Sequence, residues 1–285
     1  MITTESPRSD CTDATARSVD LLALDVDGTL LRTDKTLGRP VFDAVRRAVE
    51  HDVQVVLASA RPPRSLKPVA ERLGLDTWQI NYNGALLSRG GRNACHRPLP
   101  PALARRVIRT ARRIDPDVVV SLEILDKWYT DHFDDSLPTE TSIQFSPDFV
   151  GPLEAFLRVP VTKLMLLAPP ERLGPVRDVI HGRYAGEIRM MVCDDHLIQI
   201  VRPDVDKSVA LADVARRYGV DRARVMAVGD APNDLGMLQW AGIGVAMGNA
   251  WPTVREAADV VVPSNDEHGV ADAIDSHVLA APAGA

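Results

Sequence analysis

Two hydrophobic patterns alternate along this chain. Short, continuous apolar runs are typical of buried strands, and they occur at residues 21–24, 53–58, 78–81, 224–228, 244–247 and 258–262. Apolar residues spaced three or four positions apart predict amphipathic helices, which we expect at residues 40–51, 62–73, 206–218 and 233–241. Strands that alternate with helices predict a parallel sheet joined by right-handed crossovers, and therefore an α/β domain.

The pattern changes between residues 87 and 197. Strands are predicted there at residues 118–125, 127–131, 161–167, 188–193 and 196–201, and helices at residues 100–114 and 170–184. Residues 131–151 are acidic and rich in serine and threonine, which is typical of a long loop. Strands grouped with few helices predict an inserted α+β domain. The expected organisation is a polar, disordered tail at residues 1–19, a core of residues 20–86 and 198–285, and an inserted domain of residues 87–197.

Composition limits the class of protein. The chain has 285 residues, enough for two domains, and its 45% hydrophobic and 25% charged residues are typical of a globular protein. The net charge of -6 argues against a nucleic-acid partner, and no apolar stretch reaches membrane-spanning length. Three widely spaced cysteines in no metal-binding pattern fit a reducing compartment. We expect a cytoplasmic monomer or homodimer without a membrane or nucleic-acid partner.

Two carboxylates follow the first predicted strand, in the stretch Asp25-Val26-Asp27-Gly28-Thr29. Side chains two positions apart on a strand share a face, so Asp25 and Asp27 are expected to point into one pocket at the carboxyl end of the sheet. Two like charges at such a short distance from each other require a cation, a shared proton or a basic neighbour. The alternative is that Asp27-Gly28 is only a turn.

Other polar residues end the later strands or begin the helices after them. The Ser59 hydroxyl suits a phosphate group, although a serine at this place is more often a helix N-cap. Lys207 begins a predicted helix and, taken alone, would be a surface lysine. The oxygen-rich turn at residues 229–234 contains Asp230, Asn233 and Asp234 and suits Mg²⁺; the alternative is an Asx turn with Asn233 as N-cap.

In their order along the chain, these segments resemble the four motifs of the haloacid dehalogenase superfamily. Residues 81–85 and 235–250 resemble its Cof-type (IIB) branch, and the similarity covers residues 20–275. The resemblance implies a doubly wound α/β core with an inserted α+β cap of the C2 type. Ser59-Ala60-Arg61 replaces the more usual Thr-Gly-Arg, and Ser208 and Pro232 also depart from the usual pattern. None of these changes removes a catalytic group.

The resemblance also implies a role for each matching residue. Asp25 would be the nucleophile, and Asp27 would be the acid that protonates the leaving oxygen and later the base that activates water. Ser59 and Lys207 would bind the transferring phosphoryl group. Mg²⁺ would be held by Asp25, Asp230 and the backbone carbonyl of Asp27, and Asp234 would fix Lys207 or a metal-bound water. Further phosphate or substrate contacts are expected from Gly28, Thr29, Ala60, Arg61, Asn83 and Asn233.

The implied activity is Mg²⁺-dependent hydrolysis of a small phosphorylated metabolite through an aspartyl phosphate. A sugar phosphate and a cofactor or nucleotide phosphate are the leading substrate classes. A phosphomutase or phosphotransferase of the same superfamily is the enzymatic alternative. The non-enzymatic alternative is a regulator that binds a phosphorylated metabolite without turnover. Binding alone does not require both Asp25 and Asp27. Four arginines of the inserted domain are expected to form a solvated face, and the alternative is that this face draws anionic substrates inward: Arg105, Arg109, Arg112 and Arg113.

Overall fold

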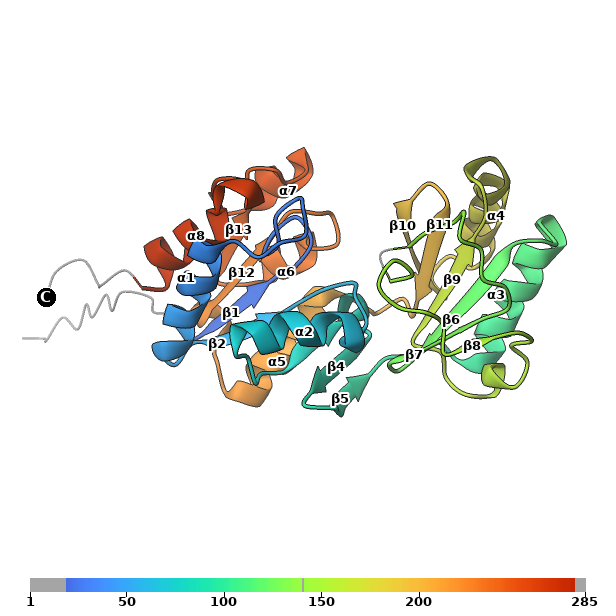
Figure 1. Cartoon of the computed structure of the whole chain (residues 1–285), viewed down its shortest axis with the longest axis horizontal. Helices are drawn as coiled ribbons and strands as arrows, with labels where there is room; N and C mark the ends of the chain where they lie inside the picture. Colours follow the sequence, from blue (N-terminus) through green and yellow to red (C-terminus); the bar gives the residue numbers. More distant parts are fainter. Residues whose placement is uncertain (1–18, 140, 280–285) are drawn as a thin grey trace, which may run out of the picture.

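The computed structural model describes residues 19–139 and 141–279, which form two bodies side by side (Figure 1). Apart from Val19, the tail predicted at residues 1–19 lies outside the described residues. An α/β core and an α+β insertion, as predicted, are confirmed. None of the helices in the described part of the chain has the length and apolar character needed to cross a membrane.

The core contains a five-stranded parallel sheet with the order β14-β13-β12-β1-β2. Its strands are β1 (Leu21–Leu24), β2 (Gln54–Leu57), β12 (Val225–Gly229), β13 (Ile243–Ala246) and β14 (Val260–Val261). Leu24, at the end of β1, is in register with Val228 of β12 and Leu57 of β2. Because β1, β2 and β12 end at nearly the same level, the polar residues that follow them meet at one edge of the sheet.

Helices cover this sheet, and their apolar faces form one core cluster with it. They are α1 (Arg39–Glu50), α2 (Pro63–Leu73), α5 (Lys207–Tyr218), α6 (Leu235–Trp240), α7 (Pro252–Ala257) and α8 (Gly269–His277). The helix α1 packs against α8, so the two ends of the described chain lie together (Figure 1). The hydrophobic pattern did not predict α7 and α8.

The segment predicted as a third core strand has a different role. β3 (Gln79–Asn81) makes one parallel bridge to the core, between Ile80 and Ala58, and then starts a separate antiparallel sheet. That sheet also contains β4 (Leu86–Arg89) and β5 (Arg92–His96). The chain reverses at η1 (Tyr82–Gly84), where all three residues have positive φ angles. The reversal brings β4 back beside β3 and makes the pairing antiparallel.

The inserted domain has a six-stranded sheet with the order β10-β11-β9-β6-β7-β8. Its strands are β6 (Val119–Ile124), β7 (Lys127–Thr130), β8 (Phe149–Val150), β9 (Lys163–Leu167), β10 (Arg189–Asp194) and β11 (Leu197–Val201). The helices α3 (Pro101–Ile114) and α4 (Pro170–Arg183) pack on the sheet through a second core cluster. The predicted loop at residues 131–151 contains the two-residue strand β8, which pairs with β7.

Strand pairing bears on where the two domains join. The boundary expected at residues 86 and 87 falls within β4, and Leu87 packs in the core cluster. The boundary expected at residues 197 and 198 falls within β11, which belongs to the sheet of the inserted domain. We therefore propose junctions near residues 97–98 and 202–205.

Candidate active site

Asp25 lies directly after β1 and is 6% exposed. The chain then turns tightly, because the amides of Leu30 and Leu31 donate to the carbonyls of Asp25 and Val26. Gly28 has a φ of 82°, and a Cβ there would lie 2.5 Å from the Oδ2 atom of Asp230. A glycine is therefore required for this turn to approach Asp230.

Lys207 is completely buried, so the surface alternative is wrong. Its Nζ atom donates to Oδ1 of Asp25 and to Oδ1 of Asp234, each at 2.6 Å. Asp206 caps the helix α5 by accepting from the amide of Ser208, and this cap fixes where Lys207 begins the helix. Burial alone would lower the pKa of Lys207, but the charges of Asp234 and Asp25 raise it above its ordinary value. Lys207 is therefore a permanent cation between two carboxylates.

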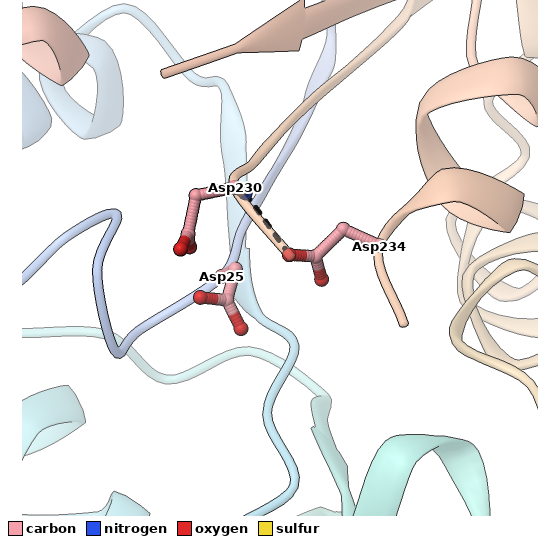
Figure 2. A group of neighbouring side chains, drawn as sticks. All are labelled: Asp25, Asp230 and Asp234. Atoms are coloured by element: carbon pink, nitrogen blue, oxygen red, sulfur yellow. Dashed lines mark hydrogen bonds between the residues drawn. The ribbon is translucent and has the colours of Figure 1, made fainter. Parts of the chain in front are cut away.

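Asp230 and Asp234 belong to the turn after β12. Thr29 is buried, and its hydroxyl donates to Oδ1 of Asp230 at 2.7 Å. Oδ2 of Asp234 accepts from the amides of Asp230 and Ala231 at 3.1 and 3.0 Å. Figure 2 shows the carboxylates of Asp25, Asp230 and Asp234 converging from these separate segments.

The three carboxylates fit a hard divalent cation. One oxygen atom from each of Asp25, Asp230 and Asp234 lies within 4.8 Å of the other two, and oxygen ligands of this kind suit Mg²⁺. Burial raises the pKa of Asp25, the charges of Asp234 and Asp230 add to this effect, and Lys207 opposes it. Burial also raises the pKa of Asp230 to about 6. A bound cation would relieve this repulsion.

Asp27 has different partners from Asp25. Arg61 donates to both of its oxygens, from Nε at 2.7 Å and from Nη2 at 2.6 Å, and Lys35 donates to Oδ1 at 2.9 Å. Burial acts to raise the pKa of Asp27, but Arg61 and Lys35 outweigh it and lower the pKa below its ordinary value. Sequence reasoning missed Lys35, which belongs to no motif.

Ser59 and its neighbours form the strand-to-helix turn after β2. Ser59 is 2% exposed, and its hydroxyl accepts from the amide of Arg61 at 3.2 Å. Its carbonyl accepts from the amide of Asn83 at 2.9 Å. The helix α2 begins at Pro63, with Pro62 as its N-cap, so the alternative that Ser59 caps this helix is wrong. Ala60 is half-buried in the same turn.

Asn233 and Asn83 meet across the core. Nδ2 of Asn233 donates to Oδ1 of Asn83 at 2.9 Å, while Nδ2 of Asn83 lies 3.2 Å from Sδ of Met191 in the inserted domain. The helix α6 begins at Leu235, after Asp234, so Asn233 is not its N-cap. Asn83 thus contacts both domains, whereas Arg61 donates to Asp27 within the core.

A buried charged cluster, which the sequence did not predict, joins the two domains beside this turn. Arg64 of α2 binds Glu123 of β6 through two hydrogen bonds of 2.7 and 3.0 Å. The hydroxyl of Tyr82 lies within hydrogen-bond distance of two acceptors, the carboxylate of Glu123 at 3.0 Å and the carbonyl of Leu125 at 2.7 Å. The amide of Tyr82 donates to the carbonyl of Arg61. The position of the inserted domain is therefore connected to the Ser59–Arg61 turn.

Glu123→Gln is expected to lower the free energy of unfolding by about 3 kcal/mol. The substitution removes the buried negative charge that compensates the positive charge of Arg64. Glu123 is fully buried, so water does not compensate. Urea titration measures this change. The matched control is Glu71→Gln, which removes an exposed ion pair with Lys67 and should cost less than about 1 kcal/mol. Equal effects of the two substitutions would contradict a structural role for the cluster.

Comparisons with known proteins identify the family of this chain. Residues 22–274 match the family of haloacid dehalogenase-like hydrolases. The 5-amino-6-(5-phospho-D-ribitylamino)uracil phosphatase YitU of Bacillus subtilis is 31% identical over 256 residues, which cover 88% of this chain and 94% of that protein.

Solved structures share the fold. A haloacid dehalogenase-like hydrolase from Bacteroides thetaiotaomicron is 27% identical, has a TM-score of 0.82 and covers 91% of this chain and 99% of its own. The structure of a HAD subclass IIB sugar phosphatase is 21% identical in sequence and has a TM-score of 0.75. The match covers 90% of this chain and 98% of the other, and it shows the same fold. The resemblance predicted from the motifs is therefore confirmed: this chain belongs to the haloacid dehalogenase-like hydrolases, in which its relatives are phosphatases.

Proposed function

We propose that this protein hydrolyses small phosphomonoesters in an Mg²⁺-dependent reaction that passes through a phosphorylated Asp25. The single observation that carries the proposal is the buried Lys207 between Asp25 and Asp234, at the edge of the sheet where Asp230 also lies. A binding protein gains nothing from burying an acidic nucleophile next to a cation and a metal-binding carboxylate. A phosphoryl-transfer enzyme needs all of them.

Asp25, Asp230 and the backbone carbonyl of Asp27 would hold the Mg²⁺ ion. When bound, the ion would neutralise phosphate charge and stabilise the charge on the transferring group. Asp234 orients Lys207 through its Oδ1 atom and the turn at residues 230–231 through its Oδ2 atom. The same carboxylate thereby supports the phosphate-binding cation and the segment that carries Asp230.

Asp25 attacks phosphorus, so an Asp25–phosphorus bond forms while the bond to the ester oxygen breaks. The attack of a carboxylate on an anionic phosphate meets a repulsion of about 4 kcal/mol per pair of charges 4 Å apart, at an effective dielectric constant near 20. Lys207 offsets this repulsion, and the Ser59 hydroxyl donates to a phosphoryl oxygen. Asn233 and the backbone of the Gly28–Thr29 turn line the same edge of the sheet.

Asp27 moves the protons in both steps. It donates a proton to the leaving oxygen, and in the second step it takes a proton from the water that attacks phosphorus and releases Asp25. Without substrate, Arg61 and Lys35 keep Asp27 ionised, because they hold its pKa below the ordinary value. An incoming phosphate competes for these cations, which allows Asp27 to take up the proton it must donate.

The substrate class is proposed to be a sugar phosphate or a cofactor or nucleotide phosphate. Support comes from the Bacillus subtilis relative, whose name describes a phosphorylated ribityl chain on an aminouracil. Release of inorganic phosphate from a panel of phosphorylated metabolites, with Mg²⁺ present, tests the activity. Selective release from members of these classes is expected. A wild-type enzyme that releases phosphate from no member of the panel would overturn the proposal.

Asp27→Asn is expected to lower kcat by about 10²–10⁴-fold, because it removes the proton donor and the base. The variant keeps the backbone carbonyl that would bind the metal, so substrate affinity should change little. An aryl phosphate with a good leaving group needs little protonation and should still phosphorylate Asp25, after which hydrolysis stalls. Stopped-flow measurement should then show a burst in which each enzyme molecule releases one molecule of the phenol leaving group. Further release should be slow, because the phosphorylated Asp25 is not hydrolysed. A variant as fast as the wild type would show that Asp27 carries no proton.

A further inference from the structure

A second basic site lies on the inserted domain, between α3 and α4. A cavity of about 280 Å³ is lined there by Arg106, Arg109, Arg113, Arg183 and Glu187, with Thr110 and Tyr184 buried at its floor. Both helices lie on the side of the inserted domain that faces away from the core (Figure 1). The cavity is thus separate from the candidate active site.

Three of the arginines share one face of α3, because residues 106, 109 and 113 are spaced by about one and two turns. The helical face expected from the sequence comprised Arg105, Arg109, Arg112 and Arg113 instead. Arg112 pairs with Asp131 and Arg105 donates to the carbonyl of Leu157, so neither lines the cavity. Arg105, Arg109 and Arg113 are exposed and Arg112 is half-buried, so the predicted solvated face and the cavity share only Arg109 and Arg113.

The cavity carries positive charge that the described part of the chain does not neutralise. Arg106 pairs with Glu187. Within residues 19–139 and 141–279, no carboxylate pairs with Arg109, Arg113 or Arg183. Like charges one helical turn apart destabilise a helix, so an anion that bridged these arginines would be stabilising.

Tyr184, at the floor of the cavity, contacts two of its arginines, Arg106 and Arg183. The hydroxyl of Tyr184 donates to the carbonyl of Arg106 at 2.9 Å and lies 2.8 Å from the hydroxyl of Thr110. The guanidinium carbons of Arg106 and Arg183 lie 5.7 and 5.9 Å from the centre of the Tyr184 ring. Side chains that are already ordered lose less entropy when they bind a ligand.

We propose that this cavity binds an oligophosphate, either free or carried by a nucleotide. Guanidinium groups bind phosphate oxygens through paired hydrogen bonds, and three unneutralised arginines match a ligand with at least three negative charges. The helix rises by about 10 Å from Arg106 to Arg113, which suits linked phosphates better than one phosphate group. Such a ligand would be an effector rather than the substrate.

Isothermal titration calorimetry of the full chain in EDTA tests the proposal with two probes that the enzyme cannot hydrolyse between phosphorus atoms. Methylenediphosphonate represents a free oligophosphate, and α,β-methylene ADP, which also has two phosphorus groups joined by a methylene bridge, represents a nucleotide. The variant Arg109→Gln/Arg113→Gln should bind at least about tenfold more weakly than the wild type, because charged hydrogen bonds are lost. Arg177→Gln, an exposed change elsewhere on α4, should stay within about twofold.

The two probes also distinguish the source of the ligand. Equal affinities mean that the phosphate chain alone is recognised, and tighter binding of the ADP analogue means that the nucleoside contributes. Arg183→Gln provides a second, single substitution on the other helix and should weaken binding in the same direction. The absence of saturable binding to the wild type, or equal binding by the wild type and the double variant, would overturn the proposal. Equal binding would place the probe in the active site instead.

Discussion

Asp25→Asn is expected to abolish turnover, with a loss of at least about 10⁴-fold in kcat, because an amide cannot form the phosphorylated intermediate. The change keeps the shape of the side chain. Lys207 keeps Asp234 as a buried partner, so the variant should fold and should still bind phosphate. Rapid-quench capture with ³²P-labelled substrate, followed by peptide mapping, should find label on Asp25 in the wild type and none in the variant.

A matched control separates this effect from a general loss of a carboxylate. Asp43 lies on the exposed side of α1 and pairs with Arg39, and Asp43→Asn should leave kcat within about twofold of the wild type. Label on a serine or histidine would contradict the mechanism. Near-normal turnover by Asp25→Asn would do the same.

Removal of divalent metal by EDTA is expected to lower the rate by at least about 100-fold, because the ion contributes several kcal/mol of charge stabilisation. Added Mg²⁺ should restore the rate. Ca²⁺ should restore little of it, since this ion accepts looser and more variable coordination. Phosphate release measured across a series of Mg²⁺ concentrations gives the midpoint of activation.

A second measurement shows whether the metal binds at the proposed carboxylates. Mg²⁺ should raise the midpoint temperature of thermal unfolding of the wild type, because a ligand that binds only the folded state stabilises that state. Asp230→Asn should remove most of this shift, whereas Asp43→Asn should retain it. Full activity in metal-free buffer would reject the metal requirement, even if Mg²⁺ raised the thermal midpoint.

Much of the core was predictable because its signals are local. A continuous apolar run such as residues 21–24 predicts a buried strand, and the polar residues after it mark the sheet edge where ligands bind. Asp25, Lys207 and Asp230, which belong to separate motifs, lie close together in the structure. Their chemical roles remain proposals.

What the sequence did not predict depends on contacts between distant segments. The pairing of Arg64 with Glu123 joins residues 59 positions apart in different domains, and neither residue belongs to a motif. Lys35 reaches Asp27 only because the chain folds back after Leu31. The antiparallel pairing of β3 with β4 depends on the chain reversal at Tyr82–Gly84, and no hydrophobic pattern describes such a reversal.

The order of the strands in the core has a consequence for how the protein folds during synthesis. β1 lies between β2 and β12, yet Leu21 is paired with Val225, more than two hundred residues later. A ribosome that has released only the first part of the chain, through β2, has therefore produced only one neighbour for β1, and its other edge stays open. Early folding of the inserted domain would shorten the loop that must close, and so would reduce the entropic barrier to completing the sheet. Until β12 emerges, the exposed edge of β1 is the site where a nascent chain is most prone to aggregate.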